Sequence, residues 1–189
     1  QLVSQAFYPS ILKFYSESRI GDLLFQFKLA MKFTGAVASI LFGLCFVLCP
    51  AFYKLWIPGQ DIDMIYRLTM AVMLYSLFEG PIQPLYYVYA LTLKNRIPTL
   101  ITLVGGILNV LIMIPILMYT DVGVIAIPTV TAGVMFVISF VTNPLYMAHC
   151  LEVKKTTFYP TIVRVMIATI VCCVVFSFAQ TFFDASTWL

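Results

Sequence analysis

Charged side chains are scarce in this sequence. Asp, Glu, Lys and Arg together make up 10% of the 189 residues, whereas hydrophobic residues make up 62%. Soluble domains average roughly 25% charged and 45–50% apolar residues. A water-soluble domain of this length could not bury so much apolar surface. The composition therefore excludes the soluble classes of protein and predicts a membrane protein.

Histidine is nearly absent, and the cysteines do not occur in closely spaced pairs of the CxxC type. His149 is the single histidine, and with the adjacent Cys150 it does not make a metal ligand set. The five cysteines form no CxxC pair, so we expect them to pack as small apolar residues without disulfides. P-loop, GxSxG and HExxH patterns are missing, and no basic face carries interleaved aromatic residues. We therefore expect no enzyme active site, no metal or cofactor, and no nucleic-acid partner.

Long apolar stretches fill most of the chain. Each has close to the ~20 residues or more that a helix needs to cross the ~30 Å hydrocarbon core of a membrane. The stretches are 33–57, 68–93, 97–120, 122–148 and 165–183. The sequence thus predicts an all-α fold, a polytopic bundle with five transmembrane helices in residues 33–189.

The positive charges gather on one side of these stretches. Only Lys54 and Arg67 flank the connections at 58–63 and Asp121. An excess of Lys and Arg in alternate loops marks the cytoplasmic side, and it explains the net charge of +3 by loops that lie beside anionic lipid. The cytoplasmic residues are Lys13, Arg19, Lys28, Lys32, Lys94, Arg96, Lys154, Lys155 and Arg164.

Residues 1–32 are predicted to form a separate region. Leu2–Tyr15 resembles the end of a transmembrane helix, and 16–32 has apolar residues at helical spacing from Ile20 to Met31. We expect this amphipathic segment to lie on the cytoplasmic surface, with its basic residues at the lipid phosphates. The alternative is a cytoplasmic extension that packs on neighbouring helices. The chain opens with Gln1 and shows no signal-peptide pattern, so we expect it to be part of a longer protein's second half.

Glu79 is the most conspicuous polar residue inside a predicted span. An ionised carboxylate at that depth costs about 2.5–3.5 kcal/mol on insertion scales. It could be a proton- or cation-linked carboxylate or a contact in a substrate cavity; the alternative is a structural hydrogen bond to a neighbouring helix. Gly80, Pro81 and Pro84 follow it, and each proline removes a helical hydrogen bond. These three are hinge candidates, although a purely structural kink is the commoner outcome, and Gln83 between them is a further cavity candidate.

Two amides lie within other predicted spans. Asn109 follows Gly105 and Gly106, which would let two helices approach closely while the amide bonds across the contact. Packing is the favoured role there, and Asn109 is kept as a cavity candidate. Asn143 precedes Pro144 and is expected to satisfy backbone groups that the proline frees.

Three cations complete the set of candidate site residues. Arg67 lies near the outer end of the second span, where it can extend to the interface or act near an outer mouth. Lys94 and Arg96 lie between the second and third spans, near a cytoplasmic entrance.

Several short motifs together resemble a known family. They are Ala6-Phe7-Tyr8-Pro9-Ser10, Leu55-Trp56-Ile57, Pro84-Leu85-Tyr86 with Ala90, Lys94-Asn95-Arg96-Ile97-Pro98, Gly106-Ile107-Leu108-Asn109 and Gly123. With them the chain resembles, over essentially its whole length, the C-terminal half of a polysaccharide (O-antigen-type) flippase of the multidrug/oligosaccharidyl-lipid/polysaccharide exporter superfamily. The resemblance implies the second lobe of a two-lobe transporter with about 12 to 14 helices around a central cavity.

The resemblance also implies a function. Such proteins move undecaprenyl-diphosphate-linked oligosaccharide across the bacterial inner (cytoplasmic) membrane by alternating access. The substrate, membrane lipids, and polysaccharide polymerase and chain-length machinery are the implied partners. The family's cavity is often cationic, whereas the mid-span charge here is Glu79, so the anion-binding part is expected mainly in the other lobe.

Three alternatives remain open. A proton- or sodium-coupled multidrug/cation antiporter of the same superfamily would use Glu79 as its exchanging carboxylate. A membrane-embedded glycan polymerase or acyltransferase would need an acceptor site in a sizeable outer loop, whereas the outer connections here are only a few residues long. A non-transporting assembly or scaffold subunit is the third. The glycan, the coupling ion and the oligomeric state have no signature in these residues.

Overall fold

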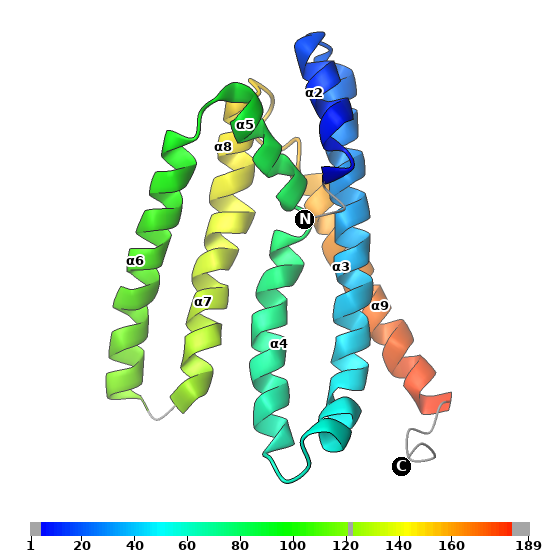
Figure 1. Ribbon diagram of the computed structural model, residues 1–189, viewed down its shortest axis with the longest axis vertical. Helices are drawn as coiled ribbons and strands as arrows, with labels where there is room; N and C mark the ends of the chain where they lie inside the picture. Colours follow the sequence, from blue (N-terminus) through cyan, green and yellow to red (C-terminus); the bar gives the residue numbers. More distant parts are fainter. Residues whose placement is uncertain (1–4, 121–122, 183–189) are drawn as a thin grey trace.

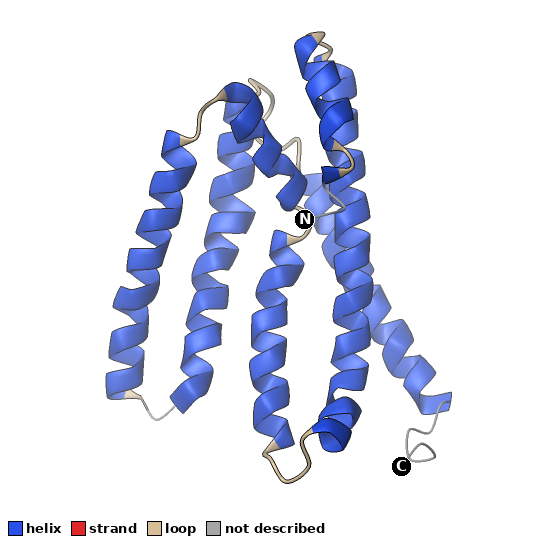
Figure 2. Cartoon of the chain, viewed as in Figure 1, coloured by secondary structure: helices blue, strands red, loops and turns tan. Residues whose placement is uncertain are grey.

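Every regular element of the described chain is a helix. The computed structural model describes residues 5–120 and 123–182, and these ranges contain no strand (Figure 2). The all-α prediction is therefore confirmed. Residues 1–4, the predicted turn at Asp121 and the end of the fifth span at Phe183 lie outside the described residues.

Four of the described helices are long and apolar enough to cross a membrane: Ile20–Trp56, Arg96–Tyr119, Gly123–Cys150 and Tyr159–Gln180. Shorter helices connect or extend them. In chain order the elements are α2 (Tyr8–Ser16), α3 (Ile20–Trp56), α4 (Ile62–Glu79), η1 (Gln83–Tyr86), α5 (Tyr87–Thr92), α6 (Arg96–Tyr119), η2 (Gly123–Ile125), α7 (Ala126–Val137), η3 (Ile138–Thr142), α8 (Asn143–Cys150) and α9 (Tyr159–Phe182).

The helices form two hairpins crossed by α9. Figure 1 shows α3 beside α4 and α6 beside α7, with α9 running obliquely behind α3. The α2–α3 turn, the α5–α6 link and the α8–α9 connection lie together at the upper end. Four of the eleven Lys and Arg residues lie in these connections, and five more lie in the nearer halves of the helices that adjoin them, so the positive-inside rule predicts that the upper end is the cytoplasmic one.

The second predicted span is interrupted. The sequence predicts one span over 68–93 with a kink at Pro81 and Pro84, and the structure divides this stretch into α4, a turn at 80–82, η1 and α5. Asp61 caps the start of α4 by accepting a hydrogen bond from the Met64 N–H at 3.1 Å. The helix ends where Pro81 and Pro84 lack the N–H groups that would continue it. Both prolines are buried, so protein encloses the break.

The N-terminal part of α3 differs from the predicted surface segment. Residues 20–32 are continuous with the following span in one helix of 37 residues. Leu23, Phe27 and Met31 are fully buried in the main hydrophobic core, which also contains Ile11 of α2 and Phe158. The apolar stripe therefore packs on neighbouring helices instead of lying in the lipid interface, which is the alternative that the sequence left open.

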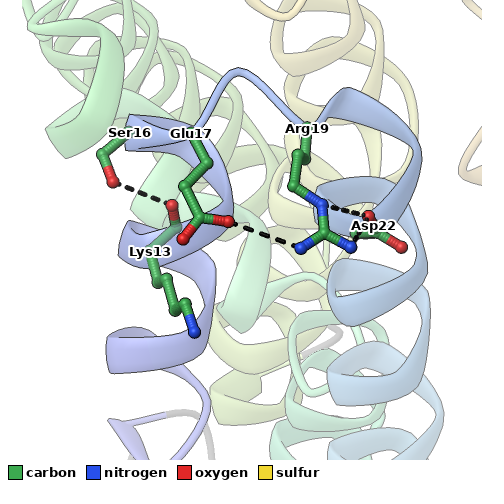
Figure 3. Close-up of polar contacts among 5 residues, drawn as sticks. All are labelled: Lys13, Ser16, Glu17, Arg19 and Asp22. Atoms are coloured by element: carbon green, nitrogen blue, oxygen red, sulfur yellow. Dashed lines mark hydrogen bonds and ion pairs between the residues drawn. The ribbon is translucent and has the colours of Figure 1, made fainter.

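A charged turn joins α2 to α3. Arg19 donates from Nε to Asp22 Oδ2 at 2.7 Å, and its Nη1 lies 3.4 Å from Glu17 Oε2 (Figure 3). Ser16 Oγ donates to the Lys13 carbonyl at 2.8 Å. All of these groups are exposed, and exposed ion pairs are worth at most about 1 kcal/mol. Their effect is to fix the shape of the turn.

Small residues bring α3 and α9 together. Gly35, Ser39 and Gly43 recur every fourth residue on α3, and all three are buried. A Cβ atom on Gly35 would meet Val165 of α9 at 2.5 Å. The Ser39 and Thr169 hydroxyls hydrogen-bond across the contact at 2.7 Å. Close backbone approach with a buried hydrogen bond is how membrane helices associate without a hydrophobic driving force.

Candidate functional site

Glu79 ends α4 and faces the α7–α8 helix. The Ser139 hydroxyl donates a hydrogen bond to Glu79 Oε2 at 2.9 Å, although the two residues are 60 positions apart in the sequence. Ser139 is 1% exposed, so this bond lies within the protein. The carboxylate therefore has a defined partner inside the bundle.

Ser139 occupies an unusual stretch of helix. Residues Ile138–Thr142 form a π-helix between α7 and α8. Pro144 explains this local widening, because it has no N–H for the carbonyl of Phe140 and its ring would press on that carbonyl in a regular α-helix. Single π turns of this kind occur frequently at functional sites.

A second set of polar groups extends from the same helix. Asn143 is 4% exposed; its Nδ2 donates to the Tyr86 hydroxyl at 3.0 Å, and its Oδ1 accepts from the Tyr89 hydroxyl at 3.4 Å. The amide thus joins α8 to η1 and α5, and its partners are tyrosine hydroxyls in place of the freed backbone groups that the sequence predicts. Tyr86 also interacts with the Glu79 carboxylate. The four side chains, with Ser139, form one polar network around the break in the second span.

The network borders a cavity of about 280 Å³. Among the described residues that line it, Glu79 is the one Asp, Glu, Lys or Arg. Hydroxyl, amide and carboxylate groups suit a cation or a ligand rich in hydroxyl groups, whereas an anion would find no cationic partner here. The lining residues are Tyr75, Glu79, Tyr86, Tyr89, Pro98, Thr99, Thr102, Met135, Ile138, Ser139 and Asn143.

The remaining candidates lie apart from this cavity. Gln83 is half-buried, and it is not one of the described residues that line the cavity. Asn109 donates to Thr131 Oγ1 at 3.1 Å, which ties α6 to α7. Arg67 is exposed on α4. Lys94 and Arg96 line a different hollow, of about 450 Å³.

The glycines beside Asn109 differ from each other. A Cβ atom on Gly105 would collide with Ile138 Cδ1, whereas one on Gly106 would meet nothing within 4 Å. Gly105 alone therefore permits a close approach of the helices, and it does so beside the π-helix.

Sequence reasoning missed four members of the network: Tyr86, Tyr89, Ser139 and Asn143 as a cavity residue. Two signals could have pointed to them. The tyrosines follow directly on the Pro81–Pro84 break, and Asn143 is a polar residue within an apolar stretch. Nothing in the local sequence indicates that the tyrosines or Asn143 lie close to Glu79. No metal-binding group of three or more His, Cys, Asp or Glu residues occurs in the described part of the chain.

Comparisons with known proteins agree with a membrane location. No protein-family model and no solved structure matches the chain. The uncharacterized membrane protein EpsK of Bacillus subtilis (strain 168) is 21% identical over 186 residues, which cover 98% of this chain and 37% of that relative. The chain thus spans little more than a third of the curated relative it matches. With four helices of membrane-spanning length and composition, this similarity supports a multi-pass membrane protein.

Proposed function

We propose that the protein is a transporter of the flippase class. It moves undecaprenyl-diphosphate-linked oligosaccharide across the bacterial cytoplasmic membrane for polysaccharide biosynthesis, and this chain forms the second lobe. Transport proceeds by alternating access, without covalent catalysis or a cofactor. The physical task is to shield a polar glycan and a diphosphate across ~30 Å of hydrocarbon.

The interrupted second span carries this proposal. Helices break at membrane depth only where protein or cavity water satisfies the freed backbone groups. Here the break after Glu79 lies beside a polar cavity of about 280 Å³. Discontinuous helices beside a midplane cavity are typical of substrate sites in transporters. Gly80, Pro81 and Pro84 are then the residues at which the second span bends as the lobe moves.

The polar network suits the glycan part of the substrate. Sugar hydroxyls donate and accept hydrogen bonds, and the Glu79 carboxylate, the Asn143 amide and the Tyr86 hydroxyl offer both functions. Lys94 and Arg96 would attract the diphosphate at the cytoplasmic entrance, and Arg67 would act near the outer mouth. Gln83 could join the cavity when the break moves, whereas Asn109 serves the α6–α7 contact. Polysaccharide polymerase and chain-length machinery are the proposed partners.

A cation antiporter is the second candidate. It is favoured by one observation, that the one Asp, Glu, Lys or Arg among the described lining residues of the cavity is Glu79. A carboxylate that binds either a proton or an organic cation could couple their exchange.

Complementation tests the first proposal. The full-length gene is expressed in a strain that lacks its own lipid-linked oligosaccharide flippase, and surface polysaccharide is measured. We expect the wild type to restore it, and Glu79→Gln to lower the yield about tenfold while still inserting into the membrane. Asp63→Asn is the matched control, since Asp63 is an exposed carboxylate on the same helix; it should restore polysaccharide fully.

Two outcomes would count against the proposal. Full activity of Glu79→Gln would remove this carboxylate from the mechanism. If the inserted wild type restores no polysaccharide but drives saturable, gradient-coupled efflux of an organic cation, the antiporter is correct.

A further inference from the structure

A second hollow opens at the cytoplasmic end of the bundle. Its volume is about 450 Å³, and it is separate from the Glu79 cavity in the residues that line it. The α5–α6 link and the start of α6 form one side, and α8 forms the other. Its lining residues are Leu93, Lys94, Arg96, Ile97, Tyr146 and His149.

The hollow is cationic and its charges are not neutralised. Lys94 and Arg96 are exposed, and no described Asp or Glu lines the hollow with them. Across residues 5–120 and 123–182, the ion pairs within 4 Å are those of Arg19 with Glu17 and Asp22. Ammonium and guanidinium groups without a carboxylate partner are the usual ligands of phosphate oxygens.

Two further donors complete the polar lining. Tyr146 and His149 lie one helical turn apart on α8, with their ring centroids 6.3 Å from each other. A tyrosine hydroxyl and an imidazole N–H can each donate to a phosphate oxygen. The donors thus come from two segments of the chain that are about 50 residues apart in sequence, and the tertiary fold brings them together.

Large apolar side chains share the same rim. Leu93 is 85% exposed and Ile97 is 48% exposed. Leu93 also adopts a left-handed conformation with φ of 55°, which is uncommon for a bulky residue. A soluble anion would make no use of these side chains, whereas a ligand with an acyl chain would cover them.

We propose that this hollow binds the phosphate head group of a lipid in the cytoplasmic leaflet. Lys94 and Arg96 contact the phosphate, Tyr146 and His149 donate hydrogen bonds to it, and Leu93 with Ile97 contacts the acyl chain. Basic pockets between transmembrane helices on the cytoplasmic side take anionic head groups in this way. An anionic phospholipid and a polyprenyl diphosphate share this chemistry. The site holds either of them whether or not the protein transports a glycan, so a failed transport assay leaves the proposal standing.

Native mass spectrometry of the purified full-length protein tests the proposal. Phosphatidylglycerol is titrated in detergent, with phosphatidylcholine as the zwitterionic comparison. The double variant Lys94→Gln/Arg96→Gln should bind phosphatidylglycerol at least about tenfold more weakly, because each charge-assisted hydrogen bond contributes a factor of that order. Lys154→Gln/Lys155→Gln is the control, since it removes two exposed cations from the same side of the membrane but outside the hollow.

The competing outcomes are distinguishable. An equal loss in both double variants would show that general surface charge attracts the lipid, and would overturn the site. Displacement of bound lipid by millimolar inorganic phosphate would overturn the lipid assignment in favour of free phosphate. Undecaprenyl diphosphate that displaces phosphatidylglycerol would support the site and identify the substrate lipid as its occupant. A thermal unfolding temperature of the Lys94→Gln/Arg96→Gln variant equal to that of the wild type establishes that the variant folds.

Discussion

The contact between α3 and α9 makes a quantitative prediction about Gly35. A Cβ atom added here would lie 2.5 Å and 2.7 Å from the two γ-carbons of Val165, whereas ordinary van der Waals contacts are 3.4–4 Å. Val165 is 5% exposed, so its side chain has little room to move away. Gly35→Ala therefore forces the two helices apart by about 1 Å at this point.

Three contributions set the expected change in the free energy of unfolding of Gly35→Ala. Overpacking of this kind costs about 1–3 kcal/mol. The Ser39–Thr169 hydrogen bond, 2.7 Å long and one turn away, would stretch with the helices, and such bonds are worth about 0.6 kcal/mol and up to roughly 1.7 in membrane proteins. Alanine gains up to about 1 kcal/mol over glycine in helix propensity. We expect Gly35→Ala to lower the free energy of unfolding by about 1–3 kcal/mol.

Thermal unfolding of the full-length protein in detergent measures this loss. Gly106→Ala is the matched control, because Gly106 is also helical but is exposed, and an added Cβ meets nothing within 4 Å. Val165→Ala removes the clashing γ-carbons, so it should restore part of the stability of Gly35→Ala in a double-mutant cycle. The reasoning is refuted if Gly35→Ala is as stable as Gly106→Ala, or if the losses of the two substitutions simply add.

Further predictions follow from the other contacts. Asn109→Ala should cost about 0.6–1.7 kcal/mol in the same unfolding assay. Thr131→Val in that background should cost much less than Thr131→Val alone, because the α6–α7 hydrogen bond is already lost and only the bond from Thr131 to the Ile127 carbonyl remains to be removed. Asn143→Leu should cost about 1–3 kcal/mol, because two tyrosine hydroxyls lose a buried partner; it should also lower complementation. Pro81→Ala/Pro84→Ala should insert normally but reduce complementation severalfold, and unchanged activity would exclude the break as a hinge.

The helical class could be predicted because apolar runs of sufficient length are enough to indicate membrane-spanning helices. The orientation stays a prediction from the one-sided distribution of Lys and Arg residues. The interruption near Pro81 and Pro84 was predictable for a similar reason, since proline acts on its own backbone. The role of the second lobe in a larger transporter stays a prediction from the family resemblance.

The partners of Glu79 could not be predicted because they are far away in sequence. Ser139 is 60 residues distant, and its position depends on a π-helix that forms next to Pro144. The burial of Leu23 and Phe27 was likewise undecided, because a helical stripe fits lipid and protein equally well. Tertiary contacts with α2 and with the α8–α9 connection bury Leu23 and Phe27 within the protein.

The π-helix at Ile138–Thr142 amounts to one extra residue in an otherwise regular transmembrane helix. If these residues formed a regular α-helix with none of them deleted, everything beyond them would rotate by about 100°. Asn143 would then turn away from Tyr86, and His149 would leave the side of Lys94 and Arg96. The Glu79 cavity and the cationic hollow thus both depend on the helical register of α8. A mutation that changes this register should disable both at once, although the two have no lining residue in common.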